Sequence, residues 1–398
     1  MNEKSGEYLF SDGAGGLQPS LTLSLAAKAK ELKEQGEDVL SLSAGEPDFD
    51  TPEHIKQAAV KSLAAGETKY TPSSGRQDLR EAIADKLQRE NRISCSAANV
   101  IVSPGAKFSV YASLAVLCRP GDEVLIPSPY WLSYPEMVKA AGGVSKMVET
   151  KAENGFCVTV DSLEEKITER TRILILNTPG NPTGGVYSRS QLKAIADLAV
   201  RRNLMVIVDE IYEKLIYGQG EEHCSIASFG PEIARRTVTV NGFSKAYSMT
   251  GWRLGYLCAP NEVAKRIGAM QSHATSNPTS FAQAGALAAM RESQEPVEIM
   301  RQAFEERRDK MHSLLEKIPG VNVHKPRGAF FIFPDISAFG LDSMTFAERL
   351  LEEAKLSVIP GFPFGADSHI RLSYAYDLET IQRGVERLAG FCAKYLKG

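Results

Sequence analysis

The sequence lacks the cysteine pairs, metal-ligand spacings and charge imbalance that mark several large classes of proteins. Its six cysteines are scattered without a C-x-x-C pair, which argues against a zinc site or a disulfide framework and for reduced thiols in the cytoplasm. The six histidines form no H-E-x-x-H or similar spacing, so no metal is expected. A formal charge of -3 gives no reason to expect nucleic acid or an anionic membrane as a partner.

Long apolar runs and targeting signals are also missing. No apolar stretch is long enough to cross a bilayer. The first eight residues carry acids and no apolar core, unlike a secretory signal, and they lack the Arg-rich character of a transit peptide. The chain has 398 residues, 43% of them hydrophobic and 24% charged, which is enough for a large buried core and more than one domain.

Strand-like and helix-like segments alternate between residues 99 and 260. Several strand candidates are continuous β-branched or aliphatic runs, the pattern of strands buried on both faces of a mostly parallel sheet. Segments between them, such as 188–202, have helical periodicity and fit right-handed crossovers. We therefore expect an α/β fold with a mostly parallel mixed sheet flanked by helices. The predicted strands are 100–102, 123–126, 173–176, 205–208, 237–240 and 254–259.

The character of the chain changes near residue 295. A long charged helix (297–317) is followed by short strand candidates and a closing helix (378–396), a mixture typical of a smaller α+β domain. We therefore expect a large domain over residues 51–295 and a small C-terminal domain over residues 296–398, preceded by an N-terminal arm. Further elements are expected as helices at 21–35, 52–65 and 77–91 and as strands at 39–44, 329–333, 357–359 and 369–373.

One stretch, Asn241–Gly255, carries a lysine and a nearby arginine on the connection between two predicted strands. The sheet would aim Lys245, and Arg253 follows after small and hydroxyl residues. A lysine held in this way, with an arginine and a partner acid, suits covalent attachment of pyridoxal 5′-phosphate (PLP). The spacing alone is weak, because most of the 46 Lys and Arg side chains are expected in solvent and a Gly-rich segment is usually a turn.

Two other strand-end loops could serve a phosphorylated ring, because ligands of open parallel sheets bind at the carboxyl ends of the strands. Gly105 and Ala106 precede a predicted helix, where small residues let backbone N–H groups approach a phosphate. The alternative is an ordinary strand-to-helix turn. Trp131 offers a face on which a heterocycle could stack, and the alternative is a tryptophan of the core.

Two charged residues lie in or next to buried strands. A carboxylate at Asp209, directly after the run 205–208, is costly unless it is paired. A protonated pyridine nitrogen would be such a partner, and helix capping is the alternative. Tyr212 could turn toward the same face and bond the 3-oxygen of the ring. Arg371 lies in a short apolar strand, where its guanidinium fits a substrate carboxylate or a neighbouring acid.

These motifs together resemble those of class I aminotransferases of fold type I. Ser244–Lys245, Met249–Arg253 and Gly255 look like the PLP-lysine signature of that family, and Asn181–Gly184 matches its Asn-Pro-x-Gly motif. The order of Asn181, Asp209, Lys245 and Arg253 also matches. The resemblance covers the chain from about residue 19 to the C-terminus and implies that residues 1–50 contribute to the small domain.

The resemblance implies roles for matching residues. The Asn181 amide would bond the 3-oxygen of PLP and the substrate carboxylate, and Arg371 would bind the α-carboxylate with help from the Gly45 loop. Asp209 would hold the pyridine nitrogen, while Arg253, Ser244 and the Gly105–Ala106 amides would hold the phosphate. One departure concerns Gly242, which stands where many relatives have a phosphate-binding serine.

The resemblance is closest to bacterial aspartate aminotransferases that use a lysine for the second substrate carboxylate. Lys107 and Thr22 stand where that subgroup has its lysine and threonine. Tyr70 matches the tyrosine that reaches the phosphate of the other subunit, which implies a homodimer with shared active sites.

The expected activity is PLP-dependent transfer of an amino group from aspartate to 2-oxoglutarate, with small amino acids and 2-oxo acids as partners. Prephenate aminotransfer, alone or together with the aspartate reaction, remains open, because the same lysine and threonine would bind its second carboxylate. A PLP-sensing regulator without enzymatic activity is the alternative from another class. Such regulators carry an added DNA-binding domain, for which the short N-terminal arm leaves no room.

Overall fold

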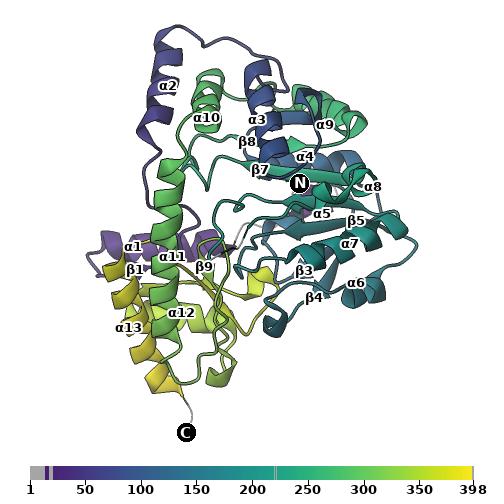
Figure 1. Ribbon diagram of the computed structural model, residues 1–398. Helices are drawn as coiled ribbons and strands as arrows, with labels where there is room; N and C mark the ends of the chain where they lie inside the picture. Colours follow the sequence, from purple (N-terminus) through teal and green to yellow (C-terminus); the bar gives the residue numbers. More distant parts are fainter. Residues whose placement is uncertain (1–13, 18–20, 219, 221, 397–398) are drawn as a thin grey trace, which may run out of the picture.

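The structure is a computed structural model that describes residues 14–17, 21–218, 220 and 222–396, without the side chains of residues 14, 21–26 and 30. Figure 1 shows the arrangement of its elements. The α-helices are α1 (Leu21–Glu34), α2 (Glu53–Ala64), α3 (Gln77–Arg89), α4 (Ala106–Leu117), α5 (Ser133–Ala140), α6 (Val160–Lys166), α7 (Arg189–Arg201), α8 (Pro231–Ala234), α9 (Asn261–Ala274), α10 (Ser280–Arg291), α11 (Glu295–Leu315), α12 (Ser343–Ala354) and α13 (Leu378–Tyr395). The strands are β1 (Leu40–Ser41), β2 (Val100–Ser103), β3 (Glu123–Ser128), β4 (Val144–Glu149), β5 (Thr171–Asn177), β6 (Met205–Asp209), β7 (Thr237–Gly242), β8 (Gly255–Cys258), β9 (Phe331–Ile332), β10 (Leu356–Ser357), β11 (Ile359–Pro360) and β12 (Ile370–Ser373).

A seven-stranded sheet with the order β2-β8-β7-β6-β5-β3-β4 forms the centre of the molecule. Neighbouring strands run parallel except at β8, which is antiparallel to both β7 and β2. The expected mostly parallel mixed sheet is therefore confirmed. Strand β4 was not predicted from the sequence, because this edge strand has mainly exposed and half-buried residues and no continuous apolar run.

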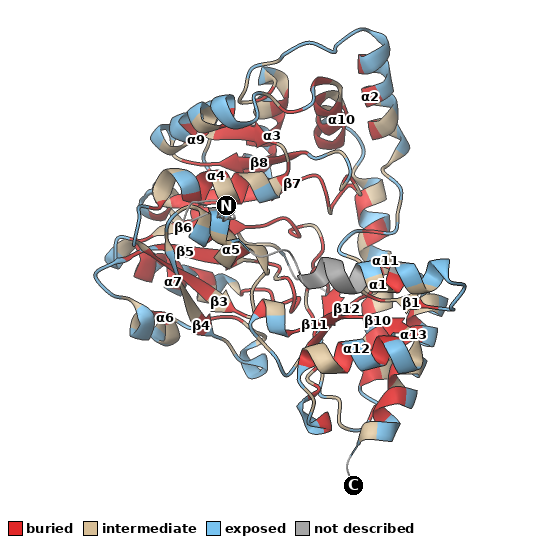
Figure 2. Cartoon of the chain, turned by 180° about the vertical axis from the view of Figure 1, so that it is seen from behind, coloured by how far each residue is buried: buried red, intermediate tan, exposed pale blue. Residues whose placement is uncertain are grey.

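The central strands are buried on both faces. Along β5, Ile173 and Ile175 share a hydrophobic core with residues of α4, whereas Leu174 and Leu176 share one with residues of α7. This alternation explains why the sequence shows a continuous aliphatic run there and no polar alternation. Figure 2 shows the buried sheet between helices whose outer faces are exposed.

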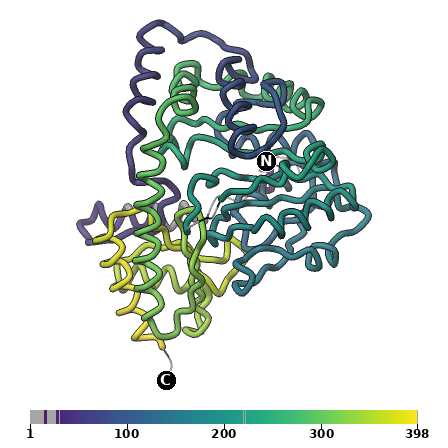
Figure 3. The backbone as a smooth tube through the Cα atoms, in the orientation of Figure 1, coloured from purple at the N-terminus to yellow at the C-terminus, as the bar shows by residue number. Residues whose placement is uncertain are grey.

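The N-terminal and C-terminal segments lie side by side (Figure 3). β1 pairs in parallel with β10, and β11, β12 and β9 form a three-stranded antiparallel sheet. The predicted strand at 329–333 pairs only over β9, because Ala329 has a left-handed backbone with φ 59° and Pro334 has no N–H to donate. The predicted strand at 39–44 likewise pairs only over β1. Among the described helices, none is both long and apolar enough to cross a membrane.

The functional loops meet at one edge of the large sheet. β2, β3, β5, β6 and β7 all point the same way, so the loops after them lie at the same edge. β8 starts at this edge because it is antiparallel to β7, and the loop between them, residues 243–254, lies there too. Open parallel sheets bind their ligands at this edge.

Candidate active site

A cavity of about 590 Å³ opens at the carboxyl edge of the sheet. Its lining comes from the segment after β1, the loops after β2, β3, β5, β6 and β7, and strand β12. Residues far apart in the sequence therefore share one cavity. The predicted site residues that line it are Gly45, Ala106, Lys107, Trp131, Asn181, Asp209, Tyr212, Ser244, Lys245, Arg253 and Arg371.

Lys245 enters this cavity from the loop between β7 and β8. Its Nζ donates a hydrogen bond to the Gly45 carbonyl oxygen at 2.5 Å and lies 6.0 Å from the centre of the Tyr212 ring. The loop is tightly folded, since Ser248 and Arg253 both have left-handed backbones, with φ 49° and 54°. Non-glycine residues rarely adopt this conformation, and it is concentrated at functional sites.

The charge of Lys245 depends on its surroundings. Burial lowers the pKa of the Lys245 amine to about 8, opposed by the Glu46 carboxylate and helped by the positive charges of Arg371 and Arg253. The Asp209 carboxylate also raises the pKa of Lys245, but less than the Glu46 carboxylate does. About a tenth of the amine is therefore unprotonated at pH 7, far more than for a lysine at its ordinary pKa, and an unprotonated amine is a nucleophile and a base.

Asp209 ends β6 with its carboxylate buried on the floor of the cavity. The Tyr134 hydroxyl donates a hydrogen bond to its Oδ2 at 2.9 Å, and the Ile211 N–H donates to its Oδ1 at 3.2 Å. Burial still raises the pKa of Asp209 to about 6, and the positive charge of Lys245 counteracts this less than either hydrogen bond. A buried acid of this kind provides a place for a cation.

Arg371 reaches the cavity from β12. Its Nη1 donates to the Asn181 Oδ1 at 2.9 Å, its Nη2 donates to the Ser43 carbonyl at 3.2 Å, and its guanidinium lies 4.2 Å from the centre of the Phe331 ring. Burial lowers its pKa to about 10. Its Nε is buried and has no hydrogen-bond partner among the residues that the structure describes. Since its recorded partners are neutral and one donor is unused, this guanidinium is suited to an incoming carboxylate.

Two glycines shape the wall beside Arg253. Gly105 has φ 91°, and a Cβ on it would lie 2.6 Å from the Arg253 Nη2. A Cβ on Gly255 would lie 2.3 Å from the backbone nitrogen of Ala106. The first turn of α4, whose Ala106 and Lys107 N–H groups have no acceptor among the described residues, therefore lies close against β8 and next to a guanidinium. This combination favours binding of an anion such as a phosphate.

Lys107 and Trp131 lie together in the lining of the cavity. The Lys107 Nζ is 5.0 Å from the centre of the Trp131 ring, and the indole packs edge-to-face on Tyr134 at 5.2 Å. Burial and the nearby charge of Arg253 lower the pKa of Lys107. The half-buried Trp131 belongs to the cavity lining, although part of its surface packs on a hydrophobic core.

Three of the predicted residues are not among the described residues that line this cavity. Gly105 comes directly before the lining residue Ala106. Tyr70 lies on the loop between α2 and α3 with 89% of its surface exposed, and it does not line the cavity. Thr22 belongs to α1, and its side chain lies outside the described residues.

The cavity also contains polar residues that the sequence analysis did not identify. Tyr134 comes one helical turn after Trp131, and that spacing was a usable signal for a side chain on the same side. Asn177, the last residue of β5, accepts a hydrogen bond from the Asn181 N–H at 2.8 Å and so helps to position that loop. Glu46 accepts a hydrogen bond from the Thr250 hydroxyl at 2.6 Å, a contact that nothing in the sequence reveals.

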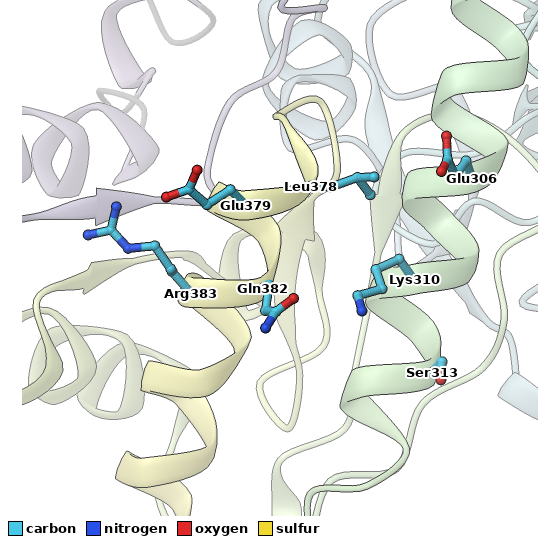
Figure 4. Close-up of a pocket in the computed structure, with 7 residues that line it drawn as sticks. All are labelled: Glu306, Lys310, Ser313, Leu378, Glu379, Gln382 and Arg383. Atoms are coloured by element: carbon cyan, nitrogen blue, oxygen red, sulfur yellow. The ribbon is translucent and has the colours of Figure 1, made fainter.

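A second hollow, of about 730 Å³, lies on the surface between α11 and α13. Figure 4 shows side chains from both helices around it, among them Lys310 and Glu379. Its charged residues have both signs and project from two regular helices. None of the residues predicted to act in chemistry lines it.

The known proteins to which this chain is similar agree with what the geometry of the cavity indicates. Residues 37–388 match the family model of aminotransferase class I and II. The chain is 48% identical to an aspartate aminotransferase of Geobacillus stearothermophilus, over 94% of this chain and 96% of that one. It is also 48% identical to a probable aspartate/prephenate aminotransferase of Aquifex aeolicus, over 94% and 95% of the two chains. The solved structure of the aspartate aminotransferase from Thermus thermophilus with maleate superposes with a TM-score of 0.92 at 43% identity, covering 96% of this chain and 100% of that one.

Proposed function

The chain belongs to the class I and II aminotransferases, and from this premise we propose that it transfers the amino group of aspartate to 2-oxoglutarate. The enzyme is an aminotransferase that acts on small amino acids and 2-oxo acids and uses PLP. The observation that carries the choice of aspartate is the presence of two cationic side chains, Arg371 and Lys107, in the cavity that Lys245 enters. A dicarboxylic substrate can use both.

The residues of the cavity fit PLP. The buried Asp209 carboxylate, which burial makes costly to ionise, would pair with the protonated ring nitrogen. The first turn of α4, pressed against Gly255, would receive the phosphate together with Arg253. The Ser244 hydroxyl would also bind the phosphate, whereas Gly242 has no hydroxyl to offer. When bound, PLP supplies an aldehyde that takes up an amino group and a charged ring that draws electrons from the bonds of the substrate α-carbon.

Lys245 would perform two tasks in sequence. Its Nζ would hold the cofactor covalently while no substrate is bound. With substrate bound, the free Nζ would accept the proton of the substrate α-carbon and give it up again. The lowered pKa suits this role, because a group that titrates near the working pH can both accept and give a proton.

Other side chains would position the two reactants. The Arg371 guanidinium would bind the α-carboxylate through two parallel hydrogen bonds, and Asn181 would stay next to it through their present contact at 2.9 Å. Tyr212, whose pKa is raised by burial, would keep its proton and donate it in a hydrogen bond to the 3-oxygen of the ring. Trp131 would stack on the ring face, and Lys107 would bind the second carboxylate.

Prephenate is the second candidate substrate, since relatives at 48% and 45% identity carry the name aspartate/prephenate aminotransferase. Prephenate also has a second carboxylate that Lys107 could bind. Thr22, which stands where the resembling subgroup has its threonine, would contribute to either substrate. The two substrates therefore need a direct comparison.

A panel of amino donors tests the proposed specificity. The reaction with each donor is measured by the change in absorbance as PLP is converted to its aminated form. Lys107→Ala should lower kcat/KM for aspartate by about 10- to 100-fold and leave alanine unchanged, because a charged hydrogen bond contributes about 1.5–3 kcal/mol. Lys166→Ala, at an exposed lysine of α6, is the matched control. An unchanged preference for aspartate over alanine in Lys107→Ala would contradict the proposal. Prephenate supplied as amino acceptor distinguishes the second candidate.

We also propose that the enzyme is a cytoplasmic homodimer with shared active sites. Tyr70 is 89% exposed, unusual for an aromatic side chain, and Val60 and Leu63 of the neighbouring helix α2 are also exposed. A partner subunit would cover these residues, and Tyr70 would reach the partner's phosphate site. The six unpaired cysteines fit a reducing compartment. The two-stranded sheet that joins β1 to β10, together with the three-stranded sheet of β9, β11 and β12, supports a small domain made of residues 1–50 and 296–398 beside a large domain of residues 51–295.

A further inference from the structure

Two cysteines that are far apart in the sequence come together at the edge of the large sheet opposite to Lys245. Cys95 precedes β2, and Cys258 ends β8, where it pairs in register with Val100. Both line a surface cavity of about 270 Å³. The start of β8 lies at the active-site edge and its end at the other, so this thiol pair is separate from the site described above.

We propose that Cys95 and Cys258 form a reversible redox site, in which a low-molecular-weight disulfide oxidises the two thiols to a cystine. The arrangement has one accessible and one shielded thiol. Cys95 is half-buried, whereas Cys258 is 6% exposed and packs in the same hydrophobic core as Cys95. A small reagent that enters the cavity meets Cys95 first, and Cys258 lies behind it.

The pKa of the Cys95 thiol is lowered and that of the Cys258 thiol is raised, as expected if Cys95 attacks first and Cys258 second. The Cys258 thiol hydrogen-bonds to Cys95 and lowers the pKa of Cys95, against the opposing effect of burial. The same contact, with burial, raises the pKa of Cys258. At the other four cysteines, burial raises the thiol pKa. Because the thiolate is the attacking species, Cys95 is the expected nucleophile of the chain.

The reaction balances as two successive thiol–disulfide exchanges. The Cys95 thiolate attacks one sulfur of the small disulfide, forms a mixed disulfide and releases the other half as a thiolate, which takes up a proton. This step removes the Cys95 thiolate, the contact that most raised the pKa of Cys258. Cys258 then loses its proton and attacks the Cys95 sulfur, releasing the second half of the reagent. Two electrons pass from the protein to the reagent, and an excess of small thiol reverses the reaction.

The test uses the PLP-loaded enzyme, reduced and then exposed to oxidised glutathione, with peptide mass spectrometry after alkylation of the remaining thiols. We expect a Cys95–Cys258 cross-linked peptide, which dithiothreitol converts back to two thiols. Cys258→Ser should instead accumulate a stable glutathione adduct at Cys95. Cys224→Ser is the matched control, because Cys224 is also half-buried, and the cross-link should form at an unchanged rate.

A second measurement uses the unmodified enzyme, so its result does not depend on whether a variant folds. In the reduced enzyme at pH 7, Cys95 should react with iodoacetamide faster than Cys224, because its thiolate fraction is larger. A cross-link between Cys95 and Cys258 together with this order of rates supports the proposal. A stable adduct at Cys95 without a cross-link, or slower alkylation of Cys95 than of Cys224, would overturn it.

Discussion

Replacement of Asp209 by asparagine should stabilise the cofactor-free protein at pH 8 and not at pH 4. In the folded protein burial raises the pKa of Asp209 from 3.8 to about 6, so the folded state holds this proton where the unfolded chain has lost it. The unfolding free energy therefore falls as the pH rises from about 4 to about 6 and stays lower above that. At about 1.4 kcal/mol per pH unit, the loss amounts to about 3 kcal/mol.

Asparagine removes this loss without disturbing the geometry. Its Oδ1 can accept from the Ile211 N–H, and the Tyr134 hydroxyl can reverse its direction and accept from the new amide. An unfolding entropy of about 2.1 cal/mol/K per residue over 398 residues is about 0.8 kcal/mol/K, so about 3 kcal/mol raises the melting temperature by about 3 to 4 °C.

Melting temperatures of the two cofactor-free proteins at pH 4 and pH 8 test this prediction, with Asp85→Asn at an exposed acid of α3 as the control. Asp209→Asn should also bind PLP more weakly and lose most of its turnover, as expected of a residue kept for function at a cost in stability. Equal differences at both pH values, or a lower melting temperature at pH 8, would refute the assignment of a costly buried charge to Asp209.

Three further predictions concern other residues of the site. Arg371→Lys should lower kcat/KM for aspartate by about 10- to 100-fold, mostly through KM, because an ammonium cannot reproduce the two parallel hydrogen bonds of a guanidinium; steady-state kinetics check this. Gly255→Ala should destabilise the protein by about 1–3 kcal/mol and weaken PLP binding, because its Cβ would lie 2.3 Å from the Ala106 nitrogen. Gly390→Ala, at an exposed position of α13 with no atom within 4 Å, should neither destabilise the protein nor weaken PLP binding; urea unfolding and PLP titration check both variants. Acylation of Lys245 in the cofactor-free protein, followed by mass spectrometry, should rise with pH and reach half its maximum at about pH 8, and a midpoint above pH 10 would contradict the effect of burial.

The central sheet was predictable because its strands are buried on both faces and therefore leave uninterrupted aliphatic runs, as at 173–176 and 205–208. The edge strand β4 was not, because its exposed and half-buried side chains resemble those of a loop. The lengths of the short strands in the C-terminal part depend on local interruptions of the extended backbone, such as the left-handed conformation of Ala329. An alanine at this position does not predict that conformation.

The residues of the cavity were predictable where a motif places them at a strand end, as for Asp209 and Lys245. Tyr134 was missed because its partner, Asp209, is distant in the sequence and their hydrogen bond depends on the fold. The pairing of Cys95 with Cys258 depends in the same way on the antiparallel contact of β2 with β8. Long-range contacts of this kind leave no local periodicity from which they could be inferred.

The account depends on covalent attachment of PLP to the amine of Lys245. Borohydride reduction of the PLP-loaded enzyme converts that bond into a stable secondary amine, and peptide mass spectrometry then locates the added mass. The account predicts stoichiometric label on Lys245, with loss of the label and of turnover in Lys245→Ala. Label on another lysine, or full turnover of Lys245→Ala, would contradict it.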